Sequence, residues 1–127
     1  MSLRNNPKPL VSIIIANYNG EKFLGRCIGS LLKEKSPNFE IIIVDDASLD
    51  KSVILINNNF GQERRLKLIT LTKNVGPAKA RNIGVENSSG KYLFFLDNDS
   101  KIKKGWLEKI PVFFLLIKGL VSHKLKY

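Results

Sequence analysis

The stretch LVSIIIA, residues 10–16, decides the fold class of this chain. It is short, rich in β-branched residues, and apolar at nearly every position rather than at every second one. A strand with one face in water alternates apolar and polar side chains, whereas a strand covered on both faces has no such requirement. The stretch therefore predicts a strand buried on both faces, as in a parallel sheet that lies between helices.

Outward from this stretch, the pattern alternates between strand and helix. Apolar residues recur at helical spacing from Leu24 to Leu32, and Ser36-Pro37 ends that helix. Further strands are predicted over residues 40–44, 66–71 and 91–96, and further helices over residues 52–60 and from Pro77 up to Ser88. This alternation indicates an α/β fold with a Rossmann-like, mainly parallel sheet and helices on both faces.

The length of 127 residues bounds the domain organisation, because it suffices for one small domain with a real core but not for two. We expect a terminal extension over residues 1–9, the α/β domain over residues 10–107, and a tail over residues 108–127. From Trp106 onward the pattern predicts a helix interrupted at Pro111, followed by the apolar run 112–117. The role of the tail stays open.

The charge of +10 attracts nucleic acid, anionic lipid or phosphorylated small molecules. The basic residues are scattered, with modest clusters such as Arg64-Arg65-Lys67 and the segment 118–126, and a solvated basic surface is the first interpretation. The sequence lacks the aromatic and basic interleaving that stacks bases, and it has no zinc-finger or recognition-helix spacing. No nucleic-acid partner is therefore expected, whereas peripheral contact with a membrane stays open.

Residues 1–9 lack the apolar run of a signal peptide, and no stretch approaches the roughly 18 apolar residues of a membrane span. The single cysteine, Cys27, cannot form an internal disulfide. We expect a cytoplasmic protein, with the inner face of the membrane as the alternative location.

Polar residues gather at the carboxyl ends of the predicted strands, where open α/β sheets bind their ligands. Asp and Asn favour turns and helix caps, which explains any one of these loops structurally. Together the loops favour a ligand site, and they are 17–20 (NYNG), 45–48 (DDAS), 73–77 (KNVGP) and 97–99 (DND).

Asp97 and Asp99 follow an apolar strand, and side chains two residues apart on an extended segment point the same way, with Asn98 turned aside. Hard cations such as Mg²⁺ and Mn²⁺ take oxygen ligands, commonly one or two carboxylates together with water and phosphate oxygens. The pair therefore predicts a divalent-cation site at which a diphosphate completes the metal shell. The helix that opens at Pro77 would offer N–H groups to phosphate or sugar oxygens.

The neighbouring carboxylates of Asp45 and Asp46 suggest two different roles. One would bind backbone N–H groups of the turn, and the other would accept a hydrogen bond from the ring N–H of a uracil-like or guanine-like base. Tyr18 is placed to cover such a base, and a buried core tyrosine is the equal alternative.

Four stretches in this order resemble the nucleotide-binding half of the family 2 inverting glycosyltransferases. They are VSIIIANYN (11–19), FEIIIVDDASLD (39–50), NVGPAKARNIGVENSSG (74–90) and KYLFFLDNDS (91–100), and the resemblance covers about residues 10–107. It implies the A-type glycosyltransferase fold and a nucleotide-diphosphate sugar, with a UDP-sugar favoured, as the donor. The α/β domain would then be the nucleotide-sugar-binding domain, with Mn²⁺ or Mg²⁺ as cofactor.

The resemblance also implies roles for individual residues. The turn Ala16, Asn17 and Tyr18 would hold the nucleoside, and Asp46 would contact uracil or its equivalent. Asp97 would face the ribose and donor sugar beside Asn98, and Asp99 would bind the metal together with Asp97. Lining the diphosphate and the sugar would be Gly76 and the stretch 79–82, with Lys79 and Arg81.

The chain departs from the family pattern in two ways. Ala16 stands where the family often has proline, a change that we expect to be tolerated. The carboxylate that serves as catalytic base in this family lies on a later segment, and nothing from Lys104 onward fits its motif, so Glu108 is interpreted as a surface residue. We therefore expect no catalytic residue in this chain and no activity of the chain alone.

Two readings follow from the missing base. The chain is the donor half of a transferase whose acceptor, a saccharide, lipid or protein, is unknown, or it is a fragment that binds a nucleotide without turning it over. The tail, including His123, would pack on the missing half, form a homodimer with a second copy, or lie on a membrane surface.

Other function classes are weaker. A dinucleotide oxidoreductase needs a glycine-rich turn after its first strand, which Tyr18-Asn19-Gly20 does not supply. A phosphatase or receiver domain would hydrolyse simple phosphate esters, and a basic module would bind polynucleotides without a metal.

Overall fold

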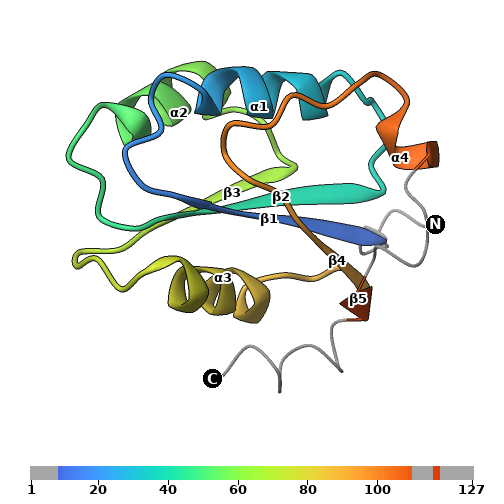
Figure 1. Ribbon diagram of the computed structural model, residues 1–127. Coiled ribbons are helices and arrows are strands. Elements are labelled where there is room, and N and C mark those ends of the chain that lie inside the picture. Colours follow the sequence, from blue (N-terminus) through green and yellow to red (C-terminus); the bar gives the residue numbers. More distant parts are fainter. Residues whose placement is uncertain (1–8, 110–115, 118–127) are drawn as a thin grey trace.

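The apolar run at residues 10–16 forms the central strand of a five-stranded sheet. In the computed structural model, which describes residues 9–109 and 116–117, this strand β1 spans Val11–Asn17. β2 (Phe39–Asp45) and β4 (Tyr92–Phe95) flank it in parallel, β3 (Leu66–Thr70) lies beside β2, and β5 (Leu116–Ile117) lies beside β4. The strand order is β3-β2-β1-β4-β5, and the first four strands are parallel (Figure 1). The predicted mainly parallel sheet is confirmed.

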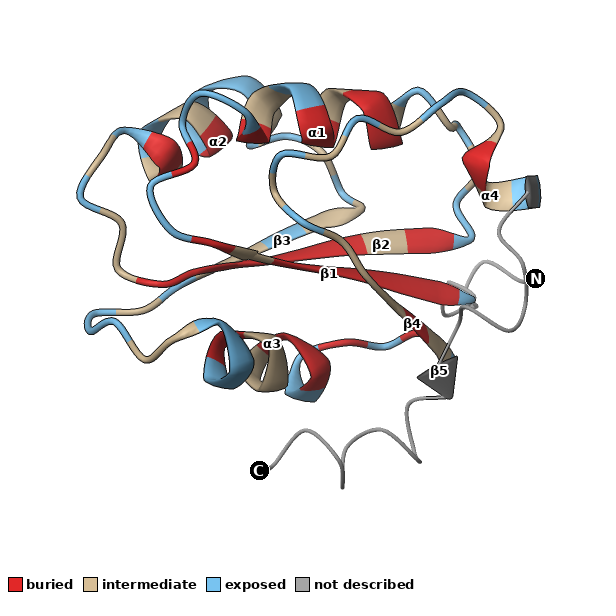
Figure 2. Ribbon diagram, viewed as in Figure 1, coloured by how far each residue is buried: buried red, intermediate tan, exposed pale blue. Residues whose placement is uncertain are grey.

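Helices cover both faces of this sheet. α1 (Leu24–Leu32) and α2 (Ser52–Phe60) lie on one face and α3 (Pro77–Glu86) on the other (Figure 1). Ile13 and Ile15 pack in a core cluster with α1 and α2 residues, whereas Ile14 packs with Ala80 of α3. β1 is therefore buried on both faces along almost its whole length (Figure 2), as its sequence predicts.

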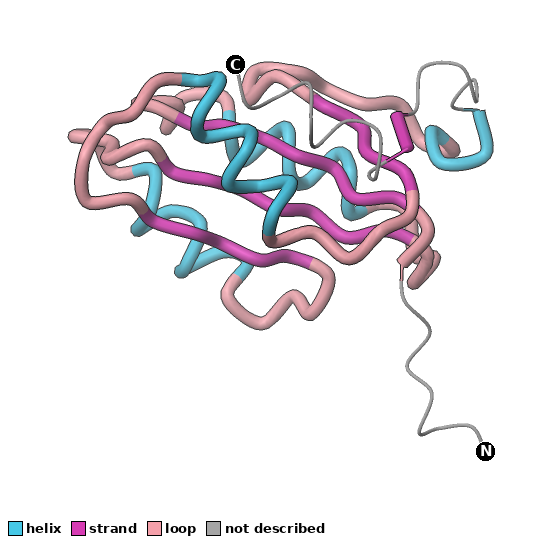
Figure 3. Tube along the Cα trace, turned by 90° about the horizontal axis from the view of Figure 1, so that it is seen from below, coloured by secondary structure: helices cyan, strands magenta, loops and turns pink. Residues whose placement is uncertain are grey.

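The crossovers place the end of β1 at a topological switch point. From β1 the chain runs through α1 to β2 and through α2 to β3, and then returns under the sheet through α3 to β4, on the other side of β1. Figure 3 shows the parallel strands side by side, with α3 crossing the near face. In open α/β sheets a ligand crevice forms where neighbouring strands diverge to opposite helical layers, which here is between β1 and β4.

The chain segment after the loop that follows β4 returns to the edge of the sheet where the parallel strands begin. It ends there in α4 (Trp106–Lys109), whose buried Trp106 donates its indole N–H to the Leu31 carbonyl at 3.2 Å and packs edge-on against Phe39, with ring centroids 4.9 Å apart. Glu108 is exposed on this short helix, in agreement with its interpretation as a surface residue. α4 thus lies at the edge opposite the switch point.

Part of the apolar run predicted for the tail forms a strand. Leu116 and Ile117 pair antiparallel with Leu93 and Tyr92, so this part of the run extends the sheet. The predictions for Lys118 to Lys126 and for His123, including the dimer and membrane surfaces, fall outside the described residues. In the described ranges, no helix has the length and apolar character that crossing a bilayer demands.

The basic cluster at residues 64–67 is not wholly a solvated surface, because the Arg65 side chain is only 17% exposed. Its guanidinium binds the Glu63 carboxylate at 3.0 Å, donates to the Glu34 and Ser36 carbonyls at 2.6 and 3.0 Å, and lies 4.7 Å from the centre of the Phe39 ring. The hydrogen bonds from Arg65 hold the pKa of Glu63 below its usual value. Arg65 therefore joins the end of α1 to the start of β3.

Substitution of two helical glycines by alanine should have opposite effects on stability. A Cβ on Gly84 of α3 would lie 2.7 Å from Ile14 Cγ2 and 3.3 Å from Val44 Cγ2, so Gly84→Ala must push α3 off the sheet. We expect it to lower the free energy of unfolding by about 1–3 kcal/mol, as overpacking does. A Cβ on Gly29 of α1 meets nothing within 4 Å.

Gly29→Ala is the matched control and should raise the free energy of unfolding by about 0.5–1 kcal/mol, because alanine loses less backbone entropy in a helix. Urea titration followed by circular dichroism measures both variants. Equal effects of the two substitutions would contradict the close approach of α3 to β1.

Candidate functional site

Asp45 organises the loop after β2 and joins it to the end of β1. It is 1% exposed, and one carboxylate oxygen accepts hydrogen bonds from Asn17 Nδ2 at 2.9 Å and Ser48 Oγ at 2.7 Å. The other oxygen accepts from the Ser48 backbone N–H at 3.0 Å. A buried carboxylate needs several such donors. Asp45 therefore holds its own turn through one backbone N–H and two side-chain donors.

Asp46 joins the same loop to the segment that enters α3. Its two oxygens accept the backbone N–H groups of Val75 at 2.7 Å and Gly76 at 3.0 Å, and the side chain is 2% exposed. Gly76 adopts φ +93°, a conformation that glycine reaches without strain, and caps α3. The predicted contact of Asp46 with a base is untested by this geometry. To bind a base, an Asp46 oxygen would have to use its second lone pair, because each oxygen already accepts one backbone N–H.

The switch point is bridged by two asparagines. Asn98, in the loop after β4, donates from Nδ2 to Asn17 Oδ1 at 2.8 Å. A Cβ on Gly20 would collide with both of these atoms, so the chain after β1 passes directly against the bridge. Through Asn17 and Asp45, the ends of β4, β1 and β2 form one hydrogen-bonded unit.

The two carboxylates of the DND segment lie on a turn. β4 ends at Phe95, and the Ser100 N–H donates to the Asp97 carbonyl at 3.1 Å, so the extended geometry assumed for residues 97–99 is wrong. Asp97 and Asp99 are both exposed on this turn. Burial raises the pKa of the Cys27 thiol to about 11, and the charges of Asp99 and Asp97 both add to that rise. The Asp97 carbonyl lies 3.7 Å from this thiol, so the turn passes beside α1.

These two carboxylates fit a divalent cation that shares its shell with phosphate oxygens. In the described residues no group of three His, Cys, Asp or Glu side chains could enclose a metal ion. Mg²⁺ and Mn²⁺ commonly bind one or two carboxylates and take their remaining ligands from water and substrate. Asp97 and Asp99 are exposed and carry acceptor oxygens. They therefore match a site in which one or two carboxylates share the metal with water and substrate, and not a site enclosed by protein ligands.

The remaining predicted residues surround this turn from two directions. On the α3 side, Arg81 Nη2 lies 4.0 Å from Asp97 Oδ1, with both side chains well exposed, so the pair is worth at most about 1 kcal/mol. Lys79 is exposed in the first turn of α3. On the other side, Tyr18 is 46% exposed, which excludes the core alternative for this residue. Ala16, partly buried, pairs with Val44 inside the sheet.

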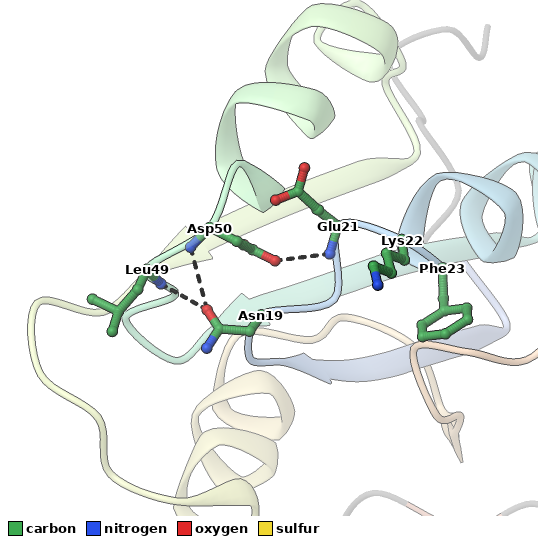
Figure 4. A pocket seen from close by; sticks show the side chains of 6 residues that line it. All are labelled: Asn19, Glu21, Lys22, Phe23, Leu49 and Asp50. Atoms are coloured by element: carbon green, nitrogen blue, oxygen red, sulfur yellow. Dashed lines mark hydrogen bonds between the residues drawn. The ribbon is translucent and has the colours of Figure 1, made fainter.

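A pocket of about 670 Å³ lies beside this site and not on it (Figure 4). It is bounded by the segments that enter α1 and α2, and the Asn19 carboxamide oxygen joins them by accepting the N–H groups of Leu49 and Asp50 at 2.7 and 3.3 Å. Burial favours the neutral form of Asp50, but hydrogen bonds from the Ser52 hydroxyl and from backbone N–H groups prevail and lower its pKa. None of the predicted site residues is among the six that line it: Asn19, Glu21, Lys22, Phe23, Leu49 and Asp50.

We place the candidate site at the exposed DND turn and not in this pocket. The converging groups at the turn are carboxylates, a guanidinium and a helix amino terminus, which suit a metal and phosphates. The acidic groups of the pocket already accept hydrogen bonds from its own backbone, Asp50 from Glu21 and Glu21 from Lys51.

Sequence reasoning missed two parts of this site. The sequence marks Gly20 only as part of a turn and carries no signal for its contact with the asparagine bridge. The pairing of Asn17 with Asn98 spans 81 residues of sequence, and only the strand order brings the two together.

Comparisons with known proteins bear on the family and the fold. A family model described as glycosyl transferase family 2 matches residues 12–111. An uncharacterized glycosyltransferase of Haemophilus influenzae is 44% identical over 115 residues, which make up 91% of this chain and 46% of that protein. The chain therefore spans less than half the length of this curated relative.

Two solved structures share the fold. The crystal structure of Staphylococcus aureus TarS 1-349 in complex with UDP-GlcNAc has a TM-score of 0.73 at 32% identity, over 79% of this chain and 29% of that chain. The mannosyltransferase PcManGT from Pyrobaculum calidifontis, solved with GDP-Man and Mn²⁺, has a TM-score of 0.67 at 22% identity, over 76% of this chain and 29% of that chain. The sheet and its helices thus match the A-type glycosyltransferase fold, as expected from the sequence.

Proposed function

The chain belongs to glycosyl transferase family 2, and from this membership we propose that it is the donor-binding half of a glycosyltransferase. The donor is a nucleotide-diphosphate sugar, with a UDP-sugar favoured, and the sugar passes with inversion to a saccharide, lipid or protein acceptor. The observation that carries the proposal is the DND turn at the switch point, joined to the end of β1 by the Asn98–Asn17 hydrogen bond of 2.8 Å. The UDP-GlcNAc bound by a structural neighbour at 32% identity supports the choice of donor.

In this proposal different site residues contact different parts of the donor. Tyr18 covers the base and Asp46 accepts its ring N–H, while the backbone around Ala16 supports the nucleoside. The diphosphate and sugar lie between the amino terminus of α3, with Gly76, Lys79 and Arg81, and the turn after β4. Oxygen-rich Asp97 and Asp99 would hold Mn²⁺ or Mg²⁺, and such a cation stabilises negative charge on a departing diphosphate.

The same proposal leaves the catalytic base outside this chain. Of the acidic residues, Glu40 accepts hydrogen bonds from Ser12 and Ser89 inside the fold, and Glu108 lies at the opposite edge. Inverting transfer needs a base to deprotonate the acceptor hydroxyl. We propose that the whole protein supplies it from a later segment, that the chain alone binds donor without transferring sugar, and that it acts in the cytoplasm.

Calorimetric titration with UDP, GDP and CDP, each with and without Mn²⁺, tests this function. We expect UDP to bind with Mn²⁺ at least about tenfold more tightly than without it, because the metal joins carboxylates to phosphates. GDP and CDP should bind more weakly than UDP. A polynucleotide titrated over a range of salt serves as control.

Metal-independent, salt-sensitive binding to the polynucleotide would instead identify a basic nucleic-acid module. The absence of any nucleotide binding to the folded chain would contradict the proposal.

A further inference from the structure

Asn17 lies at the centre of the candidate site, yet its side chain is fully buried and hydrogen-bonded within the protein. It is 0% exposed, its Nδ2 donates to Asp45 Oδ1 at 2.9 Å and more weakly to Ser48 Oγ at 3.4 Å, and its Oδ1 accepts from Asn98. Both donor hydrogens of the carboxamide have acceptors and its oxygen already accepts one bond, so the buried side chain serves contacts inside the protein.

Asn98, on the DND turn, is the hydrogen-bond partner of Asn17. Its amide ties the tip of the turn to β1, while Cys27 Sγ adds only a weak contact with the Asp97 carbonyl at 3.7 Å. The backbone anchors of this segment lie before and after the tip, where Leu96 N–H donates to the Ile14 carbonyl at 3.1 Å and Ile102 N–H to Ser30 Oγ at 2.9 Å. The Asn98 bond therefore ties the tip of the turn directly to the end of β1, between these two backbone anchors.

The bridge continues into the loop predicted to hold the nucleoside. Ser48 Oγ donates to Asp45 Oδ1 at 2.7 Å and accepts the Asn19 backbone N–H at 2.9 Å. Hydrogen-bonded networks of this kind hold their members in one arrangement when every group is satisfied. The DND turn, the end of β1 and the loop after β2 are thereby fixed relative to one another.

We propose that Asn17 and Asn98 are positioning residues, which hold the carboxylates of Asp97 and Asp99 where a divalent cation and a nucleotide diphosphate meet. This role replaces the direct nucleotide contact that the family resemblance implies for their side chains, and it rests on the proposed function. Partners that orient metal ligands without touching the metal commonly contribute 10–100-fold to metal affinity.

The test uses two variants that break the bridge in different ways. Asn98→Ala removes the donor, and Gly20→Ala leaves both amides in place but inserts a Cβ against Asn17 Oδ1 and Asn98 Nδ2. Asn87→Ala is the matched control, because it removes one side-chain amide bond, to the Ile83 carbonyl at 2.8 Å, at the far end of α3. Urea titration identifies variants that remain folded.

Two readouts are compared with the unmodified chain. Hydrogen exchange at the Ser100 amide, which donates to the Asp97 carbonyl, should become about tenfold faster in both bridge variants, because local opening becomes easier. The gain in UDP affinity on adding Mn²⁺ should fall about tenfold, while metal-free UDP affinity changes less than about twofold. Asn87→Ala should change neither readout.

The outcomes separate this inference from the proposed function. Unchanged Ser100 exchange in both bridge variants overturns the positioning role, whatever UDP does. Faster exchange together with an unchanged Mn²⁺-dependent gain also overturns it, because the turn would then move without affecting the ligand. Should the unmodified chain show no Mn²⁺-dependent UDP binding, the proposed function fails, and the exchange readout alone decides whether the asparagines fix the turn.

Discussion

Asp99→Asn is expected to weaken Mn²⁺-dependent UDP binding by at least about 100-fold. The substitution keeps the size of the side chain but removes the negative charge that a hard cation prefers in its ligands. With only Asp97 left, the chain would offer one carboxylate on an exposed turn. Loss of a direct ligand should exceed the 10–100-fold effect typical of partners that only orient ligands. Calorimetric titration with UDP, at matched Mn²⁺ concentrations, measures the loss.

Glu108→Gln is the matched control for this change. It also removes one exposed negative charge, but it does so on α4, at the edge of the sheet opposite the turn. Its effect on UDP affinity should stay within about twofold, since exposed charges are screened over roughly 10 Å at ordinary salt. If Asp99→Asn binds UDP with Mn²⁺ as tightly as the unmodified chain, the assignment of Asp99 to the metal is wrong.

Asp45→Ala is expected to have the largest effect on stability, a loss of about 4 kcal/mol in the free energy of unfolding. It removes a carboxylate that accepts three hydrogen bonds and leaves Asn17 Nδ2, Ser48 Oγ and the Ser48 N–H without their acceptor. Hydrogen bonds to charged groups contribute about 1.5–3 kcal/mol each, and unsatisfied buried donors add a penalty. Urea titration followed by circular dichroism measures the change.

Asp50→Ala provides the comparison, because Asp50 also accepts backbone N–H groups, from Glu21 at 3.0 Å and Ser52 at 2.9 Å, but lies in a less buried loop. Water can replace the lost acceptor there, so the expected loss is only about 1 kcal/mol. The free energy of unfolding of small domains is only about 5–15 kcal/mol. Asp45→Ala should therefore be close to unfolding, whereas Asp50→Ala should stay folded. Similar losses for the two would show that burial of Asp45 matters little.

The sequence predicted the layers of this fold because they depend on local pattern. Residues 11–15 are apolar at every position except Ser12, a pattern that requires cover on both faces, and the spacing of Leu24, Cys27 and Leu31 allows one helical face toward that strand. Both expectations are confirmed by the two core clusters on either side of β1. The gathering of polar loops at one edge also follows from the pattern, since parallel strands all end on the same side.

The parts that the sequence did not predict depend on distant contacts. Arg65 looks like one of several surface cations until the turn after α1 and the Phe39 ring surround it. The local pattern marks the loop at residues 97–99 but not its turn, which begins where β4 stops pairing with β1. Leu116 and Ile117 form a strand by pairing with β4, which lies more than 20 residues earlier in the sequence. Tertiary context decides each of these cases.

The position of β1 between two parallel neighbours has a consequence for the order in which the protein can assemble. During synthesis the segment 11–17 leaves the ribosome long before its second neighbour, since Asn17 and Asn98 are 81 residues apart. Closing so long a loop carries a large entropic cost and adds to the contact order, which slows folding. One edge of the central strand therefore waits unpaired until residues 92–95 arrive, and unpaired edges invite pairing with other chains. A nascent chain stopped before β4 should be prone to aggregation and should depend on chaperones.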